Sequence, residues 1–251
     1  MSTTAAPLAV RDATAQTPTK RQFVRFAFFR VDPAWRRLPA DQRGDDRDEV
    51  AGLIAEFASR ESVIMRTYTL VGTRGDADFM LWLVSDDLDQ FQEFSARLNG
   101  CRMAGWLSQP YSYFAMTKRS TYVDRHEHAD GGGEGRSKRL LVVPGGRRYL
   151  FVYPFVKTRG WYRLSKEDRQ RQMTQHIDMG HNYPSVKINT TYSFGLDDQE
   201  FVVAFESDVV SDFLDLVQEM RESEASTHTV RDTPSFTCTA VSAEEMLRAL
   251  G

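Results

Sequence analysis

The alternation of apolar and polar residues predicts the same order of elements twice along the chain: strand, helix, strand, strand, helix, strand. Runs rich in β-branched and aromatic residues mark the strands, and apolar residues three or four positions apart mark the helices. In the first half this predicts strands at 23–31, 64–71, 78–84 and 111–118, and helices at 46–60 and around 88–98. In the second half it predicts strands at 149–156, 187–195, 200–206 and 235–241, and helices at 166–181 and 210–221. A short helix at 242–250 ends the chain.

Two pairs of matching segments indicate an internal duplication. The segment Trp35–Arg43 matches Trp161–Arg169 at an offset of 126 residues, and Asp78–Phe91 matches Glu200–Phe213 at an offset of 122. Because both pairs occur in the same order at nearly the same offset, duplication explains them better than chance. The sequence therefore predicts an α+β fold in which two ferredoxin-like repeats form a dimeric α+β barrel within one chain.

Composition shifts divide the chain into four parts. Residues 1–20 are small and polar and are expected to be a disordered lead-in. Residues 21–123 form the N-terminal ferredoxin-like half, and 149–251 form the C-terminal half. Between them, 124–148 is expected to be a linker that contains a Gly-rich loop at 131–135.

Charge and hydropathy exclude several classes of function. A net charge of −3 gives no bulk electrostatic reason to bind nucleic acid or an anionic membrane. No apolar run reaches the roughly 20 residues of a membrane-spanning helix, and the N-terminus lacks the apolar core of a signal peptide. The two cysteines, Cys101 and Cys238, lie far apart and are expected to be reduced thiols. We expect a cytoplasmic protein.

A histidine lies on the apolar face of a helix in the second half. Ser165 followed by Asp168 has the spacing of a capping box at the start of this helix. His176 then falls on the same face as Met173 and Ile177. From position alone, such a histidine is either a core residue or a ligand.

The duplication provides an internal control for function. A residue that the fold alone requires should tend to occur in both copies. At an offset of 126, His176 corresponds to Val50 and Tyr153 to Ala27, so both are specific to the second half. Trp161 corresponds to Trp35, which favours a structural role for that tryptophan.

Several motifs follow one another in a fixed order: Tyr153-Pro-Phe, Trp161-Tyr, His176, the run from Asn189 to Phe201 and the run from Met220 to Ser226. Together they resemble the chlorite dismutase family, and within it the branch of coproheme decarboxylases. The resemblance implies a pair of ferredoxin-like halves in an α+β barrel, assembled as a homopentamer. It also implies a cofactor or substrate that is an iron porphyrin, haem b or iron coproporphyrin III.

The resemblance also implies roles for individual residues. His176 matches the proximal ligand of the haem iron, and Glu224 matches the carboxylate that accepts a hydrogen bond from its second ring nitrogen. Tyr153 matches the tyrosine that becomes a radical and starts propionate decarboxylation. Trp161 matches a residue that lines the porphyrin pocket. By position alone, Glu224 would be a solvated residue at a helix end.

Two further positions match residues near a propionate group. Arg221 and Ser226 carry a guanidinium fork and a hydroxyl, both suited to a carboxylate, although Arg221 also fits a solvated helix end. The basic residue that assists Tyr153 is left unassigned. The cations expected near the barrel mouth are Arg147, Arg148, Lys157, Arg159, Lys187 and Arg221.

The distal side of the porphyrin is where the chain departs from the chlorite-degrading members. Those proteins carry an arginine thirteen residues after the proximal histidine, and here that position is Asn189. Without the guanidinium, chlorite dismutation is disfavoured. The distal residue is therefore Asn189 or one of two histidines in the linker, His126 and His128, each of which would otherwise be an exposed loop residue.

The resemblance implies a peroxide-dependent oxidative decarboxylase. Iron coproporphyrin III and hydrogen peroxide are the expected partners, and loss of two propionates as carbon dioxide would give the two vinyl groups of haem b. The porphyrin would carry the difficult chemistry. Two alternatives are a chlorite dismutase or peroxidase-like haem enzyme, and a non-catalytic protein that binds or delivers haem.

Overall fold

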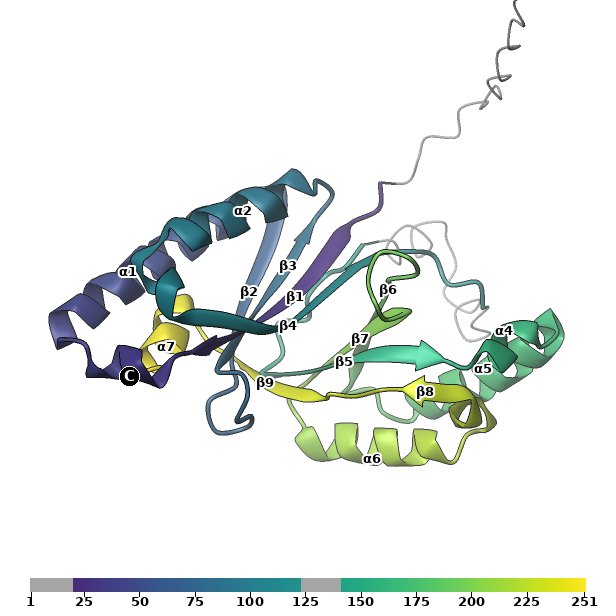
Figure 1. Cartoon of the computed structure of the whole chain (residues 1–251). Helices are drawn as coiled ribbons and strands as arrows, with labels where there is room; N and C mark the ends of the chain where they lie inside the picture. Colours follow the sequence, from purple (N-terminus) through teal and green to yellow (C-terminus); the bar gives the residue numbers. More distant parts are fainter. Residues whose placement is uncertain (1–19, 123–140) are drawn as a thin grey trace, which may run out of the picture.

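The computed structural model describes residues 20–122 and 141–251, and its strands form one antiparallel sheet closed into a barrel. The strands are β1 Phe23–Val31, β2 Val63–Thr69, β3 Phe79–Ser85, β4 Leu107–Met116, β5 Tyr149–Lys157, β6 Lys187–Tyr192, β7 Phe201–Ser207, β8 Thr229–Arg231 and β9 Phe236–Ala240. Their order is β7-β6-β4-β1-β3-β2-β9-β5-β8, and a further pairing of β7 with β5 closes the ring (Figure 1). The mixed α+β fold with an antiparallel sheet agrees with the class that the sequence predicts.

Both halves of the barrel have the same strand order. In the first half it is β4-β1-β3-β2, and in the second it is β9-β5-β7-β6. The halves join where β2 pairs with β9 and where β4 pairs with β6. The linker prediction for 124–148 lies largely outside the described residues, as does the prediction for the N-terminal lead-in.

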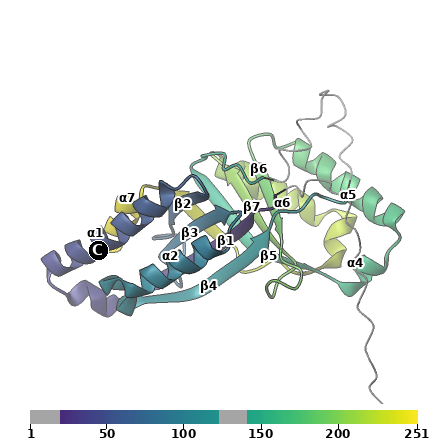
Figure 2. The same cartoon turned by 90° about the horizontal axis from the view of Figure 1, so that it is seen from above.

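Helices cover the outside of the barrel in both halves (Figures 1 and 2). They are α1 Ala40–Ala58, α2 Asp89–Gly100, α4 Arg159–Arg163, α5 Lys166–His181, α6 Val210–Arg221 and α7 Ala243–Arg248, with 3₁₀ turns η1 Pro33–Arg37, η2 Arg102–Trp106 and η4 Glu224–His228. Helices α5 and α6 have the bounds that the sequence predicts. Helix α1 begins six residues before the predicted start, because its first turns are polar and carry no apolar spacing. No helix in 20–122 or 141–251 combines the length and hydrophobicity needed to cross a membrane.

The period of two along each strand divides the core into an inner and an outer layer. On β1, Phe26 and Phe28 point into the barrel, whereas Ala27 and Phe29 point toward the helices. On β5, Leu150 and Val152 lie in the barrel interior. Residues of odd number on β5 therefore face the helices of the second half.

The outer layer is packed densely in the first half and sparsely in the second. Helix α1 buries Val50, Leu53, Ile54 and Phe57, and the C-terminal α7 adds Met246 and Leu247 to the same cluster. The buried residue on α5 is a single polar one, Gln172. Since α5 buries no apolar side chain, space remains between this helix and the sheet.

Candidate functional site

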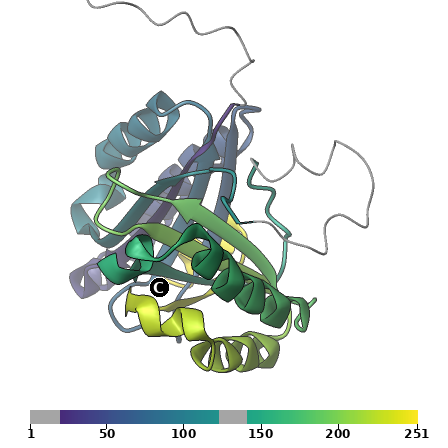
Figure 3. The ribbon, with the colours of Figure 1, turned by 90° about the vertical axis from the view of Figure 1, so that its right-hand side faces the viewer.

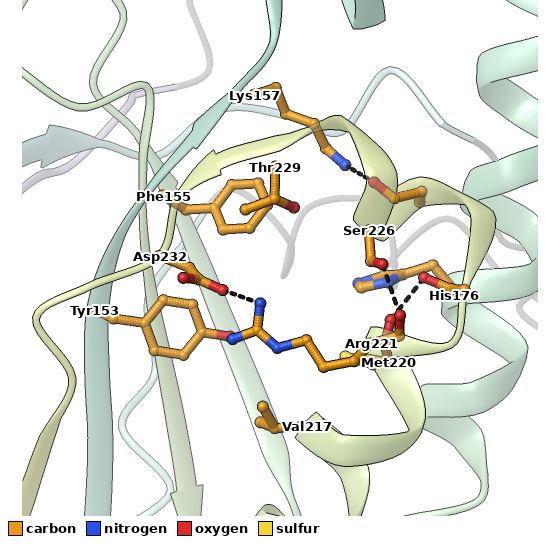
Figure 4. A pocket seen from close by; sticks show the side chains of 12 residues that line it. Tyr153, Phe155, Lys157, His176, Val217, Met220, Arg221, Ser226, Thr229 and Asp232 are labelled. Carbon is orange, nitrogen blue, oxygen red and sulfur yellow. Dashed lines mark hydrogen bonds and ion pairs between the residues drawn. The ribbon is translucent and has the colours of Figure 1, made fainter.

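A pocket of about 60 Å³ of free volume lies between the outer face of β5 and the helical segments α5, α6 and η4 (Figure 4). The ribbon in Figure 3 shows α5 and α6 in the foreground, over the strands of the second half. The lining of the pocket comprises Tyr153, Phe155, Lys157, His176, Val217, Met220, Arg221, Ser223, Ala225, Ser226, Thr229 and Asp232. Four of the sequence-predicted site residues are among them: Tyr153, His176, Arg221 and Ser226. The outer layer of the second half is thus hollowed where the first half is filled.

Strand β5 contributes one wall of the pocket. Its alternation places Tyr153, Phe155 and Lys157 on the face that points toward the helices. The Tyr153 ring stacks on Phe205, with the centroids 5.7 Å apart. Burial raises the pKa of the Tyr153 phenol, and Asp232 raises it further. The phenol therefore stays protonated at neutral pH.

Helix α5 positions His176 on the opposite side of the pocket. The helix is capped by Ser165, whose hydroxyl accepts a 3.0 Å hydrogen bond from the amide of Asp168. Burial, and then the charge of Lys157, lower the pKa of His176 to about 4. A neutral imidazole has a free lone pair, which is the form that binds a metal ion.

We expect the titration of His176 to appear as a pH-dependent stability. Its pKa of about 4 in the folded chain lies below the ordinary value of 6.5, so between these values only the unfolded chain takes up the proton. Stability is then lost as the pH falls from 6.5 toward 4, by roughly 1–2 kcal/mol after allowance for partial exposure. Denaturant unfolding at pH 7.5 and 4.5 should show a smaller loss in His176→Gln than in the wild type. His181→Gln, at the exposed end of α5, is the control, and equal losses in all three proteins would contradict this assignment.

Lys157 is one of the two predicted cations that line the pocket, with Arg221 as the other. Its ammonium donates a 2.8 Å hydrogen bond to the carbonyl of Ala225 and lies 4.3 Å from the centre of the Trp161 ring. Burial lowers the pKa of Lys157 to about 8, and Glu200 opposes that shift. Lys157 can therefore exchange a proton near neutral pH more readily than an exposed lysine.

Trp161 does not line the pocket but packs against Lys157, which does. Its side chain is buried, and it contacts the pocket through the Lys157 ammonium. Its counterpart Trp35 is also buried and donates a 3.0 Å hydrogen bond to Asp46. Both tryptophans fill equivalent places in the two halves, which agrees with the structural role that the repeat indicates.

Arg221 and Ser226 are placed together at the end of α6. The Ser226 hydroxyl donates a 2.7 Å hydrogen bond to the carbonyl of Arg221. The Arg221 side chain runs across the pocket toward β5 and forms an ion pair with Asp232, close to the Tyr153 hydroxyl (Figure 4). Asp232 is a pocket residue that the sequence analysis missed.

Glu224 is the first residue of η4 and is not among the residues that line the pocket. Arg171 donates to both of its carboxylate oxygens, at 2.5 and 3.0 Å, and lowers its pKa. Gln172 donates a third bond of 3.0 Å to it. The Gln172 amide oxygen is buried and has no partner among the described residues. Gln172, one helical turn before His176, is therefore one of three α5 residues that hydrogen-bond to Glu224, together with Arg171 and Gln175.

Asn189 points into the barrel and away from the pocket. It pairs in register with Ala204, an inner-layer residue, and donates a 2.9 Å hydrogen bond to the buried Glu206. Counting thirteen residues from His176 does not predict on which face of β6 a side chain lies. The pairing register of β6 with β7 does determine the face. The neighbouring Ile188 and Thr190 face the helices, and the Ile188 side chain lies near Gly180 of α5. His126 and His128 lie outside the described residues.

The other predicted cations lie away from the pocket lining. Arg147 pairs with Asp208 at 2.9 Å, and Lys187 donates to the carbonyl of Val143. Arg159 is exposed near Glu200. Among the six candidates, Lys157 and Arg221 line the pocket.

The fold and the pocket together define an α+β barrel protein that presents a histidine and a tyrosine to one cavity. Residues 20–241 match the model of the chlorite dismutase family, and the chain belongs to this family. It is 31% identical over 230 residues to a protein of Mycolicibacterium smegmatis named coproheme decarboxylase, covering 91% of this chain and 94% of that one.

Solved structures of the same family superpose on most of the chain. A mutant chlorite dismutase from Candidatus Nitrospira defluvii matches with a TM-score of 0.80 and 27% identity, over 91% of this chain and 95% of that one. The chlorite dismutase of the same organism in complex with imidazole matches with a TM-score of 0.78 and 26% identity, over 91% and 94%.

Proposed function

We propose that this protein catalyses the peroxide-dependent oxidative decarboxylation of two propionates of iron coproporphyrin III, giving haem b. The observation that carries the proposal is the pocket in which His176 and Tyr153 face each other from α5 and β5, with Arg221 beside Tyr153. The relative named coproheme decarboxylase supports the choice of reaction.

The residues present fit an iron porphyrin. The low pKa of His176 leaves its imidazole neutral, as an iron ligand must be. The buried amide oxygen of Gln172, one turn away, is an acceptor without a donor among the described residues. Phe155, Val217 and Met220 add apolar surface for a macrocycle. Arg221 and Lys157 supply positive charge for its carboxylates.

Each chain residue then has a defined part in the reaction. When bound, the iron porphyrin supplies the oxidising equivalents of hydrogen peroxide. His176 would hold the iron, and Tyr153 would take two electrons from each propionate, one at a time, and pass them toward the iron. Because its phenol is protonated at neutral pH, Tyr153 must release its proton together with the electron. Arg221 orients the propionate by a charge-assisted hydrogen bond.

Lys157 is assigned to the His176 side of the pocket, where burial, and then the charge of Lys157, lower the pKa of that imidazole. Phe155 lies between Lys157 and Tyr153 on the same face of β5, so the basic residue that assists Tyr153 stays unassigned. The Lys157 ammonium is held in place by the Ala225 carbonyl and the Trp161 ring.

Chlorite dismutation is the second candidate, because the solved relatives carry that name. Two features weigh against it. Asn189 carries no guanidinium and points into the barrel, and the helix-facing neighbours on β6 are Ile188 and Thr190. A haem carrier without turnover is the third, and it gives Tyr153 no chemical task.

The proposal includes two ferredoxin-like repeats and a homopentamer. Equivalent hydrogen bonds support the repeats: Asp78 accepts from the amide of Val31, and Glu200 from the amide of Lys157, each at 2.8 Å. These pairs occupy matching places at the start of the second hairpin strand in each half. Asp78 and Glu200 therefore serve the scaffold in both copies.

The proposed function is tested by adding iron coproporphyrin III and hydrogen peroxide to the protein and following the products by mass spectrometry. We expect two successive losses of carbon dioxide, each with two hydrogens, ending at haem b. A parallel sample with chlorite should release no oxygen. Oxygen release without decarboxylation would favour the chlorite dismutase, and porphyrin uptake with unchanged mass would favour the carrier.

A further inference from the structure

The Arg221–Asp232 ion pair lies across the pocket and was not expected from the sequence. Arg221 is the last residue of α6, and Asp232 follows β8, so the pair joins the helical wall to the strand wall (Figure 4). The Asp232 side chain is 18% exposed and that of Arg221 is 56% exposed. In Figure 4 the guanidinium lies close to the Tyr153 hydroxyl, and Asp232 and Arg221 both act on the pKa of this buried phenol.

The pair occupies space that a porphyrin would need. About 60 Å³ is free in the pocket, whereas sites for ligands of this kind enclose roughly 300–1,000 Å³. The Arg221 side chain crosses the pocket between His176 and Asp232, so a planar macrocycle that reaches both His176 and Tyr153 needs the space that this side chain fills. Displacement breaks the ion pair and leaves the mostly buried Asp232 carboxylate without its cation, which is costly unless another interaction compensates.

We propose that Asp232 holds Arg221 across the pocket until a carboxylate of the substrate replaces it, so that the pair selects porphyrins bearing a propionate at this position. This inference rests on the proposed function and deepens it. When a propionate binds, an Arg221–propionate bond replaces the Arg221–Asp232 bond. A vinyl group at the same place gives the guanidinium no partner, so the cost of breaking the pair is not recovered. Asp232 thus acts as a competitor that lowers affinity for every porphyrin and lowers it more for those without the carboxylate.

The electrostatics around Tyr153 agree with this arrangement. Asp232 raises the pKa of Tyr153 and Arg221 lowers it. When Arg221 turns from Asp232 to a propionate, the guanidinium stays near the Tyr153 phenol. The propionate then replaces Asp232 as the partner of Arg221. The exchange would therefore place the reacting group beside Tyr153 in the same step that opens the pocket.

Asp232→Asn tests the inference by equilibrium binding, read from the absorbance of the iron porphyrin. We expect iron coproporphyrin III to bind about three- to tenfold more tightly than to the wild type, because a neutral amide competes less well for Arg221. Haem b, which lacks two of the propionates, should gain more, so the preference for iron coproporphyrin should shrink. Asp208→Asn is the matched control, since it breaks an Arg–Asp pair with Arg147 elsewhere on the second half.

Combining the substitutions isolates the pair. In an Arg221→Ala background, Asp232→Asn should no longer improve haem b binding more than iron coproporphyrin III binding, because the competition needs both partners. Only the repulsion between Asp232 and a propionate is then relieved. Weaker or unchanged binding in Asp232→Asn, with the thermal midpoint of the wild type retained, would overturn the inference. A wild type that binds neither porphyrin would instead overturn the proposed function, so the two failures are distinguishable.

Discussion

Tyr153→Phe should lower the rate of decarboxylation by at least about a hundredfold while leaving the affinity for iron coproporphyrin little changed. Phenylalanine fills the same place against Phe205 but cannot give up an electron and a proton together. The variant therefore keeps the shape of the β5 wall and loses its chemistry. Stopped samples analysed by mass spectrometry measure the rate, and absorbance titration measures the affinity.

Tyr149→Phe provides the matched control for this prediction. Tyr149 lies four residues earlier on β5, and it packs against the same outer cluster as Tyr153 without lining the pocket. Its loss should leave the decarboxylation rate close to that of the wild type. Product formation undiminished in Tyr153→Phe would remove Tyr153 from the mechanism, even if the activity itself were real.

His176→Ala is expected to have the largest effect on binding. The helix that carries His176 packs no apolar side chain into the core, so removing the imidazole should cost little stability while removing the one iron ligand we assign. Affinity for the iron porphyrin should fall by more than the roughly 10–100-fold typical of losing a group that only orients a ligand. Free imidazole should restore part of the absorption spectrum.

Hydrophobic periodicity and helix-capping residues were sufficient to predict most of the helices and strands that the structure shows. Helices α5 and α6 were predicted with their observed bounds, and Ser165 caps α5 as its spacing indicates. Strand β8 was missed because it has three residues and no apolar alternation. The packing of α7 against the first half was also missed, since a short amphipathic helix does not reveal which core it joins.

The sequence likewise predicted some residues of the candidate site and missed others. Comparing the two copies singled out His176 and Tyr153, and both line the pocket. Lys157 could have been singled out, because strand alternation from Tyr153 places it on the same face. Asp232 had no such signal, since its pairing with Arg221 depends on how β8 returns to β5.

Glu224 and Asn189 are two predicted site residues that do not line the pocket, and their roles toward a porphyrin stay predictions. The structure places Glu224 in a bidentate contact with Arg171 and Asn189 against Glu206, on the inner side of the sheet. A motif gives the order of residues along the chain. The direction of a side chain depends on register and on competing ion pairs, which a motif alone does not provide.

The central claim is that an iron porphyrin binds in the pocket between α5 and β5 with His176 as its iron ligand. Absorbance titration of iron coproporphyrin III into the wild type, His176→Ala and His181→Ala tests it most directly. We predict a histidine-ligated spectrum in the wild type and in His181→Ala, and its loss with weakened binding in His176→Ala. An unchanged spectrum and affinity in His176→Ala would contradict the claim.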